Sequence, residues 1–435
     1  MTYAPSRRSL WRDIIDVVPP TTVADEPKTP GVQEKLAPNG IKKYRVYPTT
    51  AQQATIKMWL GAVRWTYNKA VAYLNDDGTK GARTIKQLRA RCVNDETISA
   101  STRSSWVGCI PYDVRDEGVR DAQKALGSNM AKQRLRKKHG LPFSFALKYR
   151  RLKRSFQQTL VIHSKHWLKT RGLYYDLLGR AGNKLRSAEP LPAVLTYDIR
   201  LTRTRLNEYY LCVPMANEVY GDNQAVDESM PCTVAMDPGV RTFMTTYDAA
   251  GRVVEWGAGD MTRIHRLCRS INSLEKCWTK EDCNHRLRYR LQRAALRIRR
   301  RIRRMVDEIH RKLIKWLCSN FRVILIPVFE TQQMIRRRNG RSRLSLQTAK
   351  DMLTWSHFRF RTNLKHKALM FPATYIVETT EEYTSKTCGI CGAINQKLGR
   401  KKVFTCGACA HCSDRDFNGA RNILIRHLTV NRVSP

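Results

Sequence analysis

Two Cys-x2-Cys pairs near the end of the sequence constrain the fold of this chain more than any other feature. Cys388 and Cys391 form the first pair, Cys406 and Cys409 form the second, and fourteen residues lie between the pairs. This spacing is typical of a tetrahedral site in which four thiolates hold one Zn²⁺. Because protein ligands would fill all four positions, we predict a structural zinc ion that folds a loop and does not react.

The net charge of the chain predicts a polyanionic partner. Its 435 residues include 79 Lys and Arg against 37 Asp and Glu, which gives a formal net charge of +42. A protein this basic repels itself unless it meets a polyanion, so long nucleic acid is the expected partner. A membrane surface is another polyanion, but the sequence shows neither an apolar run that could span a bilayer nor a secretory signal at its start.

Cysteine usage predicts an intracellular, reducing environment. The chain has thirteen cysteines, and most of those outside the two pairs stand singly in apolar contexts. Buried thiols show this pattern, whereas a disulfide framework does not. His411 and Cys412 are spare ligands that could replace one of the four cysteines, although we expect Cys412 to be a bystander.

The N-terminal part is expected to contain a tail and a helical lobe. Residues 1–40 are rich in Pro, Thr and charge without periodicity, which predicts a disordered tail. A strand is predicted at Lys42–Tyr47, and Thr49 or Thr50 is expected to cap the helix that follows. Apolar residues at helical spacing predict further helices at Thr84–Cys92 and Val114–His139, the last of which ends in a basic run.

Between Phe143 and about residue 219, the sequence consists of short segments rich in β-forming residues, separated by turn residues. Strands are predicted at 156–162, 174–178, 194–201 and 209–213. Together with the first strand they could close a small barrel into which the helical lobe is inserted.

The second half predicts an α/β domain with the element order of an RNase H-like fold. Three antiparallel strands come first. A long amphipathic helix with an apolar stripe from Leu287 to Leu317 follows them. A strand, a helix, a strand and a closing helix complete the domain. The first three strands are predicted at 233–237, 242–247 and 253–256. After the long helix, strands are predicted at 323–326 and 374–377, and helices at 345–369 and 416–427.

Two aspartates lie at positions where an RNase H-like fold has its catalytic residues. Asp237 ends the first strand, and Asp416, with Asn418 two residues later, opens the last helix directly after the cysteines. Asp-Pro-Gly is also an ordinary turn, and Asp before a helix is often an N-cap. In a chain this basic, however, the pair predicts a metal and phosphate site, because phosphodiester hydrolysis by two Mg²⁺ ions needs carboxylate ligands.

Two basic segments are predicted to contact phosphates. Acidic partners are nearly absent around the arginines of the long helix between Arg286 and Arg304, so a phosphate-facing surface is favoured over a solvated face. The residues predicted to bind nucleic acid are Lys132, Arg134, Arg136, Lys137, Lys138, Arg297, Arg300, Arg301 and Arg304.

Several motifs together resemble the TnpB family of transposon-encoded, RNA-guided nucleases, and most closely its eukaryotic and viral Fanzor branch. The resemblance runs from about Lys42 to the last helix. The motifs that carry it are Tyr47-Pro-Thr49, Trp65 with Tyr67-Asn68, Asp237-Pro-Gly239, Tyr383-Thr-Ser385-Lys-Thr-Cys388 and Asp414-Arg-Asp416-Phe-Asn418-Gly-Ala-Arg-Asn422.

The resemblance implies a domain organisation and partners. It implies a wedge barrel (41–50 and 143–230), a helical recognition lobe (51–142), a RuvC nuclease domain (231–383 and 414–435) and an inserted zinc ribbon (384–413). Members bind a guide RNA, the omega RNA, that is encoded beside the gene, and they cut double-stranded DNA. We therefore expect a monomeric protein within a ribonucleoprotein, in the nucleus of a eukaryotic or virus-infected host.

One position departs from the family. The usual second carboxylate is a Glu at the end of the fourth strand, where this chain has Pro327. Fanzor proteins carry a displaced Glu further along, and Glu378 best matches it, with Glu330 and Glu382 as fallbacks. The expected site is therefore Asp237, Glu378 and Asp416 with two Mg²⁺ ions.

The sequence predicts an RNA-guided DNA endonuclease and leaves one serious alternative. A guide-dependent binding protein that no longer cuts would have the same fold and charge, and the missing Glu supports it. A transposase that joins DNA ends is disfavoured because the sequence shows no strand-transfer machinery.

Overall fold

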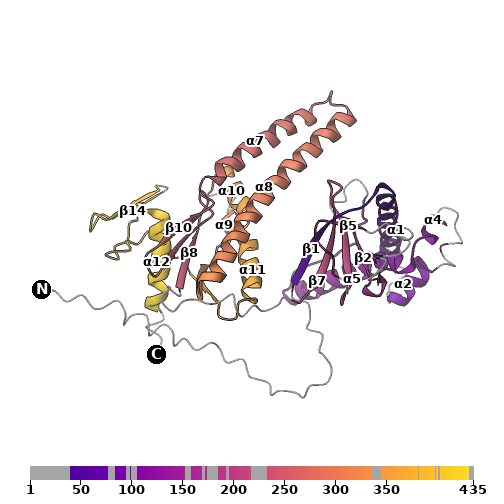
Figure 1. Cartoon of the computed structure of the whole chain (residues 1–435), viewed down its shortest axis with the longest axis horizontal. Helices are drawn as coiled ribbons and strands as arrows, with labels where there is room; N and C mark the ends of the chain where they lie inside the picture. The colour runs from indigo at the N-terminus through magenta and orange to yellow at the C-terminus, as the bar shows by residue number, and fades with distance from the viewer. Residues whose placement is uncertain are drawn as a thin grey trace, which may run out of the picture. The chain divides into compact units, whose positions relative to one another are not determined.

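The computed structural model describes residues 40–76, 84–94, 98, 105–151, 158–168, 172–173, 185–192, 195–216, 233–335, 344–380, 382–396, 398–399 and 402–430. All of them belong to one compact unit, Asn39–Pro435. The predicted tail, apart from Gly40, and the strand predicted at 174–178 lie outside the described residues. Figure 1 shows the arrangement of the elements.

An antiparallel sheet and several helices form the N-terminal part (Figure 1). Its five strands lie in the order β2-β6-β7-β1-β5. The strands are β1 (Gly40–Tyr47), β2 (Gln158–Ile162), β5 (Arg186–Ser187), β6 (Ile199–Arg203) and β7 (Tyr209–Met215), and the helices are α1 (Thr50–Asn75), α2 (Ile85–Cys92), α4 (Ser105–Gly108) and α5 (Tyr112–Lys138). The 3₁₀ turn η4 (Ser164–His166) and the small hairpin of β3 (Trp167–Leu168) and β4 (Gly172–Leu173) complete this part.

The predicted barrel is not closed among the described residues. The edge strands β2 and β5 each pair with a single neighbour, so the sheet stays open. Because β5 has only two residues, both opposite the end of β1, it offers too few backbone groups to pair with a second strand.

Local sequence signals explain where the helices of the N-terminal part begin and how they pack. Thr49 caps α1, as the sequence predicts, and forms a capping box with Gln52; Thr84 forms the same kind of capping box at the start of α2. Gly118 of α5 meets α1 so closely that an added Cβ would lie 2.0 Å from the Thr66 hydroxyl. A glycine is therefore required for α5 to lie against α1.

A second five-stranded sheet organises the C-terminal part, in the order β10-β9-β8-β11-β12. Its strands are β8 (Thr233–Pro238), β9 (Met244–Asp248), β10 (Val253–Trp256), β11 (Val323–Pro327) and β12 (Tyr375–Thr379). The first three are antiparallel, whereas β11 is parallel to both β8 and β12. This is the strand arrangement that the RNase H-like element order predicts.

Helices cover both faces of this C-terminal sheet (Figure 1). On one side, the α8 face, Met236, Ile324 and Ile326 pack with residues of α8 (His285–Asn320), α10 (Leu346–Trp355) and α11 (His357–Ala368). On the other side, the α12 face, Ala235 and Leu325 pack against α12 (Arg415–Val430). Since strand residues alternate between faces, each strand position can be assigned to one face.

Three helical features differ from the prediction. A helix α7 (Asp260–Thr279) precedes α8 and packs along it as a long hairpin (Figure 1). The helix predicted at 345–369 is two helices, because Ser356 adopts a left-handed conformation (φ +55°) between α10 and α11. A short helix α9 (Thr331–Ile335) also follows β11. Among the described residues, no helix combines the length and apolarity that crossing a membrane requires.

Candidate functional site

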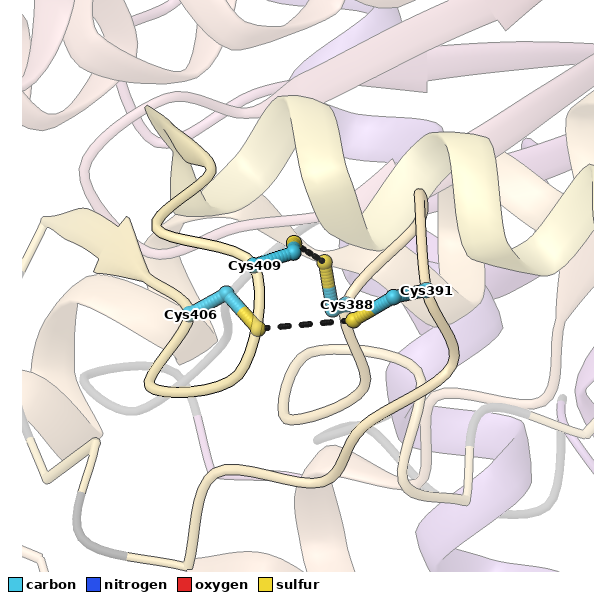
Figure 2. Close-up of side chains that lie close together, drawn as sticks. All are labelled: Cys388, Cys391, Cys406 and Cys409. Carbon is cyan, nitrogen blue, oxygen red and sulfur yellow. Dashed lines mark hydrogen bonds between the residues drawn. The ribbon is translucent and has the colours of Figure 1, made fainter.

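The four predicted cysteines come together in the segment that contacts α12. Figure 2 shows their side chains pointing toward one another. The Sγ atoms of Cys388 and Cys409 are 3.7 Å apart, those of Cys391 and Cys406 are 3.5 Å apart, and all four lie within 4.8 Å of one another. Four sulfurs at about 2.3 Å from a tetrahedral Zn²⁺ would be roughly 3.8 Å apart, so the cluster fits a structural zinc ion.

Two backbone turns hold the sulfurs in place. The Gly392 amide donates to the Cys388 carbonyl (3.0 Å), and the Ala408 amide donates to Cys406 Sγ (3.4 Å). The amides of Cys409 and Ala408 lower the pKa of the Cys406 thiol to about 6, which favours the thiolate that zinc requires. Within the described residues, neither His411 nor Cys412 joins the cluster, and Cys412 lies on β14 (Cys412–Asp414), paired with β13 (Val403–Thr405).

Two buried asparagines of α12 tie the cysteine segment to the sheet. Asn418 Oδ1 accepts from the Gly389 amide (2.9 Å), and its Nδ2 donates to the Thr387 carbonyl (2.7 Å). Asn422 Nδ2 donates to the carbonyls of Thr384 (2.8 Å) and Thr387 (2.6 Å). Both ends of the Asn418 amide thus bind backbone, and in this structure the side chain holds the cysteine segment against α12.

Asp237 of β8 lies against α12, the helix that carries Asp416. An added Cβ on Gly419 would lie 2.6 Å from Asp237 Oδ2, so the carboxylate touches the backbone of α12. Asp416 lies one turn earlier on the same helix. Burial raises the pKa of Asp416, and the negative charges of Asp414 and Glu255 raise it further.

Asp414, and not Asp416, is the N-cap of α12. The Asp416 amide donates to Asp414 Oδ1 (2.9 Å), so Asp414 supplies the capping interaction. The Asp416 carboxylate is therefore not used as the cap. It remains in the first turn of α12, where the helix dipole favours an anion even though burial and its acidic neighbours do not.

Glu255 is an acidic residue of this site that sequence reasoning missed. It lies on β10 opposite Thr245 of β9, which in turn lies opposite Asp237 of β8. Residues paired in this way share one face, and the next residue, Trp256, packs on the α8 face. Glu255 and Asp237 thus both face α12, and the Thr242 hydroxyl lies 3.5 Å from Glu255 Oε1.

Glu378 lies on the opposite face of the sheet from Asp237. It pairs with Ile326 of β11, a residue of the α8 face, and alternates with Val377, which packs on the α12 face. Its Oε1 is 2.8 Å from Lys365 Nζ and 3.6 Å from Arg361 Nε, both on α11. The structure therefore does not bring Glu378 together with Asp237 and Asp416.

The two fallback residues are both exposed. Glu330 is exposed at the start of α9, and its carbonyl accepts from the Met334 amide. Glu382 is exposed, 3.7 Å from Arg426 Nη2, and its carbonyl accepts from Arg426 Nη1. Arg426 is ten residues along α12 from Asp416, a rise of about 15 Å.

Carboxylates on the α12 face offer the oxygen ligands that Mg²⁺ prefers. Asp237, Glu255 and Asp416 come from three elements, and the charges of Glu255 and Asp414 oppose ionisation of Asp416. A divalent cation would relieve that repulsion. Among the described residues, only the four cysteines bring three or more possible ligand atoms within 4.8 Å of one another. The oxygens of Asp237, Glu255 and Asp416 are therefore further apart than the cysteine sulfurs.

Two family models match parts of the chain. The "Cas12f1-like, TNB domain" matches residues 357–423, which include the four cysteines and the start of α12, and a "Helix-turn-helix domain" matches residues 41–79.

Curated relatives match nearly the whole chain. A provisionally named transposase of Paramecium bursaria Chlorella virus 1 is 28% identical over 89% of this chain and 87% of its own length. A TnpB-like protein of Acanthamoeba polyphaga mimivirus is 25% identical over 95% and 79%. The chain is therefore similar to these two viral proteins over most of its length. A Streptomyces pristinaespiralis protein, provisionally named an RNA-guided DNA endonuclease, is 23% identical over 89% of both chains.

Two solved structures align with this chain. CasPhi-2 (Cas12j) bound to crRNA aligns with a TM-score of 0.44 and 9% identity, over 90% of this chain and 98% of its own. The Cas12f1–sgRNA–target DNA complex aligns with a TM-score of 0.32 and 15% identity, over 88% and 98%.

The predicted nucleic-acid-binding residues differ in their surroundings. Arg297, Arg301 and Arg304 of α8 are exposed, whereas Arg300 is half-buried and pairs with Glu208. The basic end of α5 is fully exposed, including Lys132, Arg134, Arg136, Lys137 and Lys138. Exposed cations without nearby acids are available to bind phosphates.

Proposed function

We propose that this protein is an RNA-guided DNA endonuclease that hydrolyses phosphodiesters at the α12 face of the C-terminal sheet. The observation that carries the proposal is the contact of Asp237, at the carboxyl end of β8, with Gly419, one turn along α12 from Asp416. Relatives provisionally named RNA-guided DNA endonucleases, similar to this chain over most of its length, support the same activity.

In this proposal Asp237, Glu255 and Asp416 hold Mg²⁺. Two such ions, when bound, activate a water and neutralise the leaving oxygen of the phosphodiester. Glu255 replaces the expected Glu378, because a side chain on the α8 face cannot reach ligands on the α12 face without crossing the sheet. Burial of Asp416 raises its pKa, so metal affinity should increase with pH as this carboxyl loses its proton.

The zinc-bound segment would support the site indirectly. Asn418 and Asn422 attach the cysteine loops to α12, and the same helix carries Asp416 and Gly419. A zinc ion at the cysteines would therefore fix the helix that presents one of the carboxylates.

A guide RNA, the omega RNA, would pair with the target DNA strand, and the exposed arginines of α8 and lysines of α5 would contact phosphates. We expect a monomeric protein in a ribonucleoprotein that acts in the nucleus of a eukaryotic host. Relatives in viruses of eukaryotes support this location.

A guide-dependent binder without nuclease activity is the second candidate. Pro327 stands at the end of β11, where the family carries a glutamate, and Glu378 pairs with two cations instead of facing Asp237. Both observations would be expected of a chain that has lost its metal site.

The experiment co-expresses the protein with RNA transcribed from the DNA that flanks its gene, and then measures Mg²⁺-dependent cleavage of plasmids with a guide-matched site. Asp237→Asn should abolish cleavage. Glu255→Gln should reduce it by more than about 100-fold, beyond the roughly 10- to 100-fold typical of residues that only support a ligand. Glu378→Gln and Glu382→Gln are the matched controls and should retain activity.

Calorimetric titration with Mn²⁺ gives an independent readout of the same variants. Glu255→Gln should weaken binding, and Glu378→Gln should leave it unchanged. Loss of cleavage and metal binding in Glu378→Gln but not in Glu255→Gln would refute the assignment. Guide-dependent DNA binding without cleavage under any metal would favour the binder.

A further inference from the structure

The end of α5 carries a pocket that the proposed nuclease chemistry does not use. Its volume is about 650 Å³, and its lining includes Arg134 and Lys137 from the helix and Leu141, Pro142 and Phe143 from the segment that follows. This size lies within the roughly 300–1,000 Å³ typical of sites for small molecules. The lining therefore combines cationic and apolar side chains.

Hydrogen bonds fix the shape of the pocket before anything binds. Gly140 has a positive φ of +66°, and its amide donates to the Lys137 carbonyl (3.0 Å). The Leu141 amide donates to the Arg136 carbonyl (2.9 Å), which ends the helix and turns the chain back. Gln133 Nε2 donates to the Phe143 carbonyl (3.1 Å), so the aromatic residue is held against the helix.

The Phe143 ring is the centre of a cationic environment. Lys132 Nζ lies 5.1 Å and the Arg136 guanidinium 5.7 Å from the ring centroid. The sequence from Lys132 to Arg151 contains no acidic residue. A ligand of this pocket therefore has to combine negative charge with a flat face that can stack on an aromatic ring.

We propose that this pocket binds an unpaired nucleotide, with its base stacked on Phe143 and its phosphate held by Arg134 and Lys137. A duplex buries the faces of its bases within the stack, so only an unpaired base can use the ring. This inference rests on the proposed function, because it takes nucleic acid as the partner. It adds selection for single-stranded segments, which phosphate contacts alone do not provide.

The experiment measures the affinity of the full-length protein for labelled oligonucleotides of one sequence, as single-stranded RNA, single-stranded DNA and duplex. Phe143→Leu should weaken single-strand binding by about tenfold, because stacking on one base contributes on that scale, and leave duplex binding within about twofold. Phe143→Trp should restore it. Arg134→Gln should weaken binding of all three ligands.

Phe358→Leu is the matched control, since Phe358 is an exposed phenylalanine that also has a cation over its ring, the Arg361 guanidinium at 5.8 Å. It should leave single-strand binding unchanged. The RNA and DNA arms show which strand supplies the nucleotide. Equal losses for duplex and single strand, or unchanged binding in Phe143→Leu, would overturn the inference while the proposed function stands. A wild type that binds no nucleic acid would overturn both.

Discussion

Replacing Gly419 by Ala tests the contact on which the candidate site depends. The new Cβ would lie 2.6 Å from Asp237 Oδ2, whereas ordinary contact begins at 3.4 Å. The carboxylate or the helix must therefore move by about 0.8 Å. A displacement of about 1 Å in a reacting geometry costs on the order of 100-fold in rate, so cleavage should fall by about that factor.

The stability of Gly419→Ala is a balance of two effects. Removing a glycine from a helix interior stabilises by about 1 kcal/mol, and overpacking a buried contact costs about 1–3 kcal/mol. We expect a net destabilisation of about 0–2 kcal/mol, measured by denaturant unfolding of the purified protein. In an Asp237→Ala background the carboxylate is gone, so Gly419→Ala should become stabilising by about 1 kcal/mol.

Gly127→Ala is the matched control. Gly127 is exposed within helix α5, and nothing lies within 4 Å of its added Cβ. This variant should gain about 1 kcal/mol and cleave like the wild type. Two results would contradict the contact of Asp237 with α12, and with it the candidate site. One is a Gly419→Ala variant as active as the wild type. The other is an effect of Gly419→Ala on the free energy of unfolding that is the same in the wild-type and Asp237→Ala backgrounds.

Three further results are expected. Cys391→Ser should release zinc to a colorimetric chelator at lower chelator concentration than the wild type and should reduce cleavage, since α12 loses its attachment; full activity without zinc would contradict this. Burial lowers the pKa of His310 to about 4 and of His357 to about 3. The unfolding free energy should therefore fall by up to about 1.4 kcal/mol per pH unit and per histidine as the pH drops from about 6.5 toward about 4. An unfolding free energy that does not change with pH in denaturant titrations would refute this. Arg301→Gln with Arg304→Gln should weaken DNA binding and reduce the log–log salt slope by about 0.9 for each phosphate that is no longer neutralised; an unchanged slope would show that these side chains do not bind phosphates.

Much of the fold could be predicted because its signals are local. The Thr49 cap and its Gln52 partner are three residues apart, and the apolar stripe of α8 repeats within one helix. The four cysteines lie within 22 residues. None of these predictions requires knowing which strand pairs with which.

The missed elements had weaker or competing signals. Helix α7 carries an apolar stripe at Met261, Ile264 and Ile271, but the charged residues interspersed along the same helix obscured it. Ser356 gave no sign that it would adopt a left-handed conformation, since a non-glycine residue rarely does. The break between α10 and α11 follows from packing on the α8 face, where Trp355 and Phe360 are both fully buried.

The third carboxylate shows where sequence reasoning reaches its limit. The match to the displaced Glu favours Glu378 at the end of a strand, but residues near a strand end alternate between the two faces of the sheet. Ile376 packs on the α8 face, so counting two residues onward puts Glu378 there as well. Glu255 could be found only from the register that pairs it with Thr245 and Thr245 with Asp237. Register depends on turns and partners far along the chain.

The last helix then links the parts of the site that the sequence presented as separate motifs. Asp414 caps α12, which leaves the carboxylate of Asp416 available to a cation. Gly419 lets Asp237 reach the helix, and Asn418 and Asn422 bind the cysteine segment. Since one rigid helix carries these contacts, losing zinc and crowding Asp237 should damage the same function by different routes. Combining Cys391→Ser with Gly419→Ala should then reduce cleavage by less than the product of the single effects.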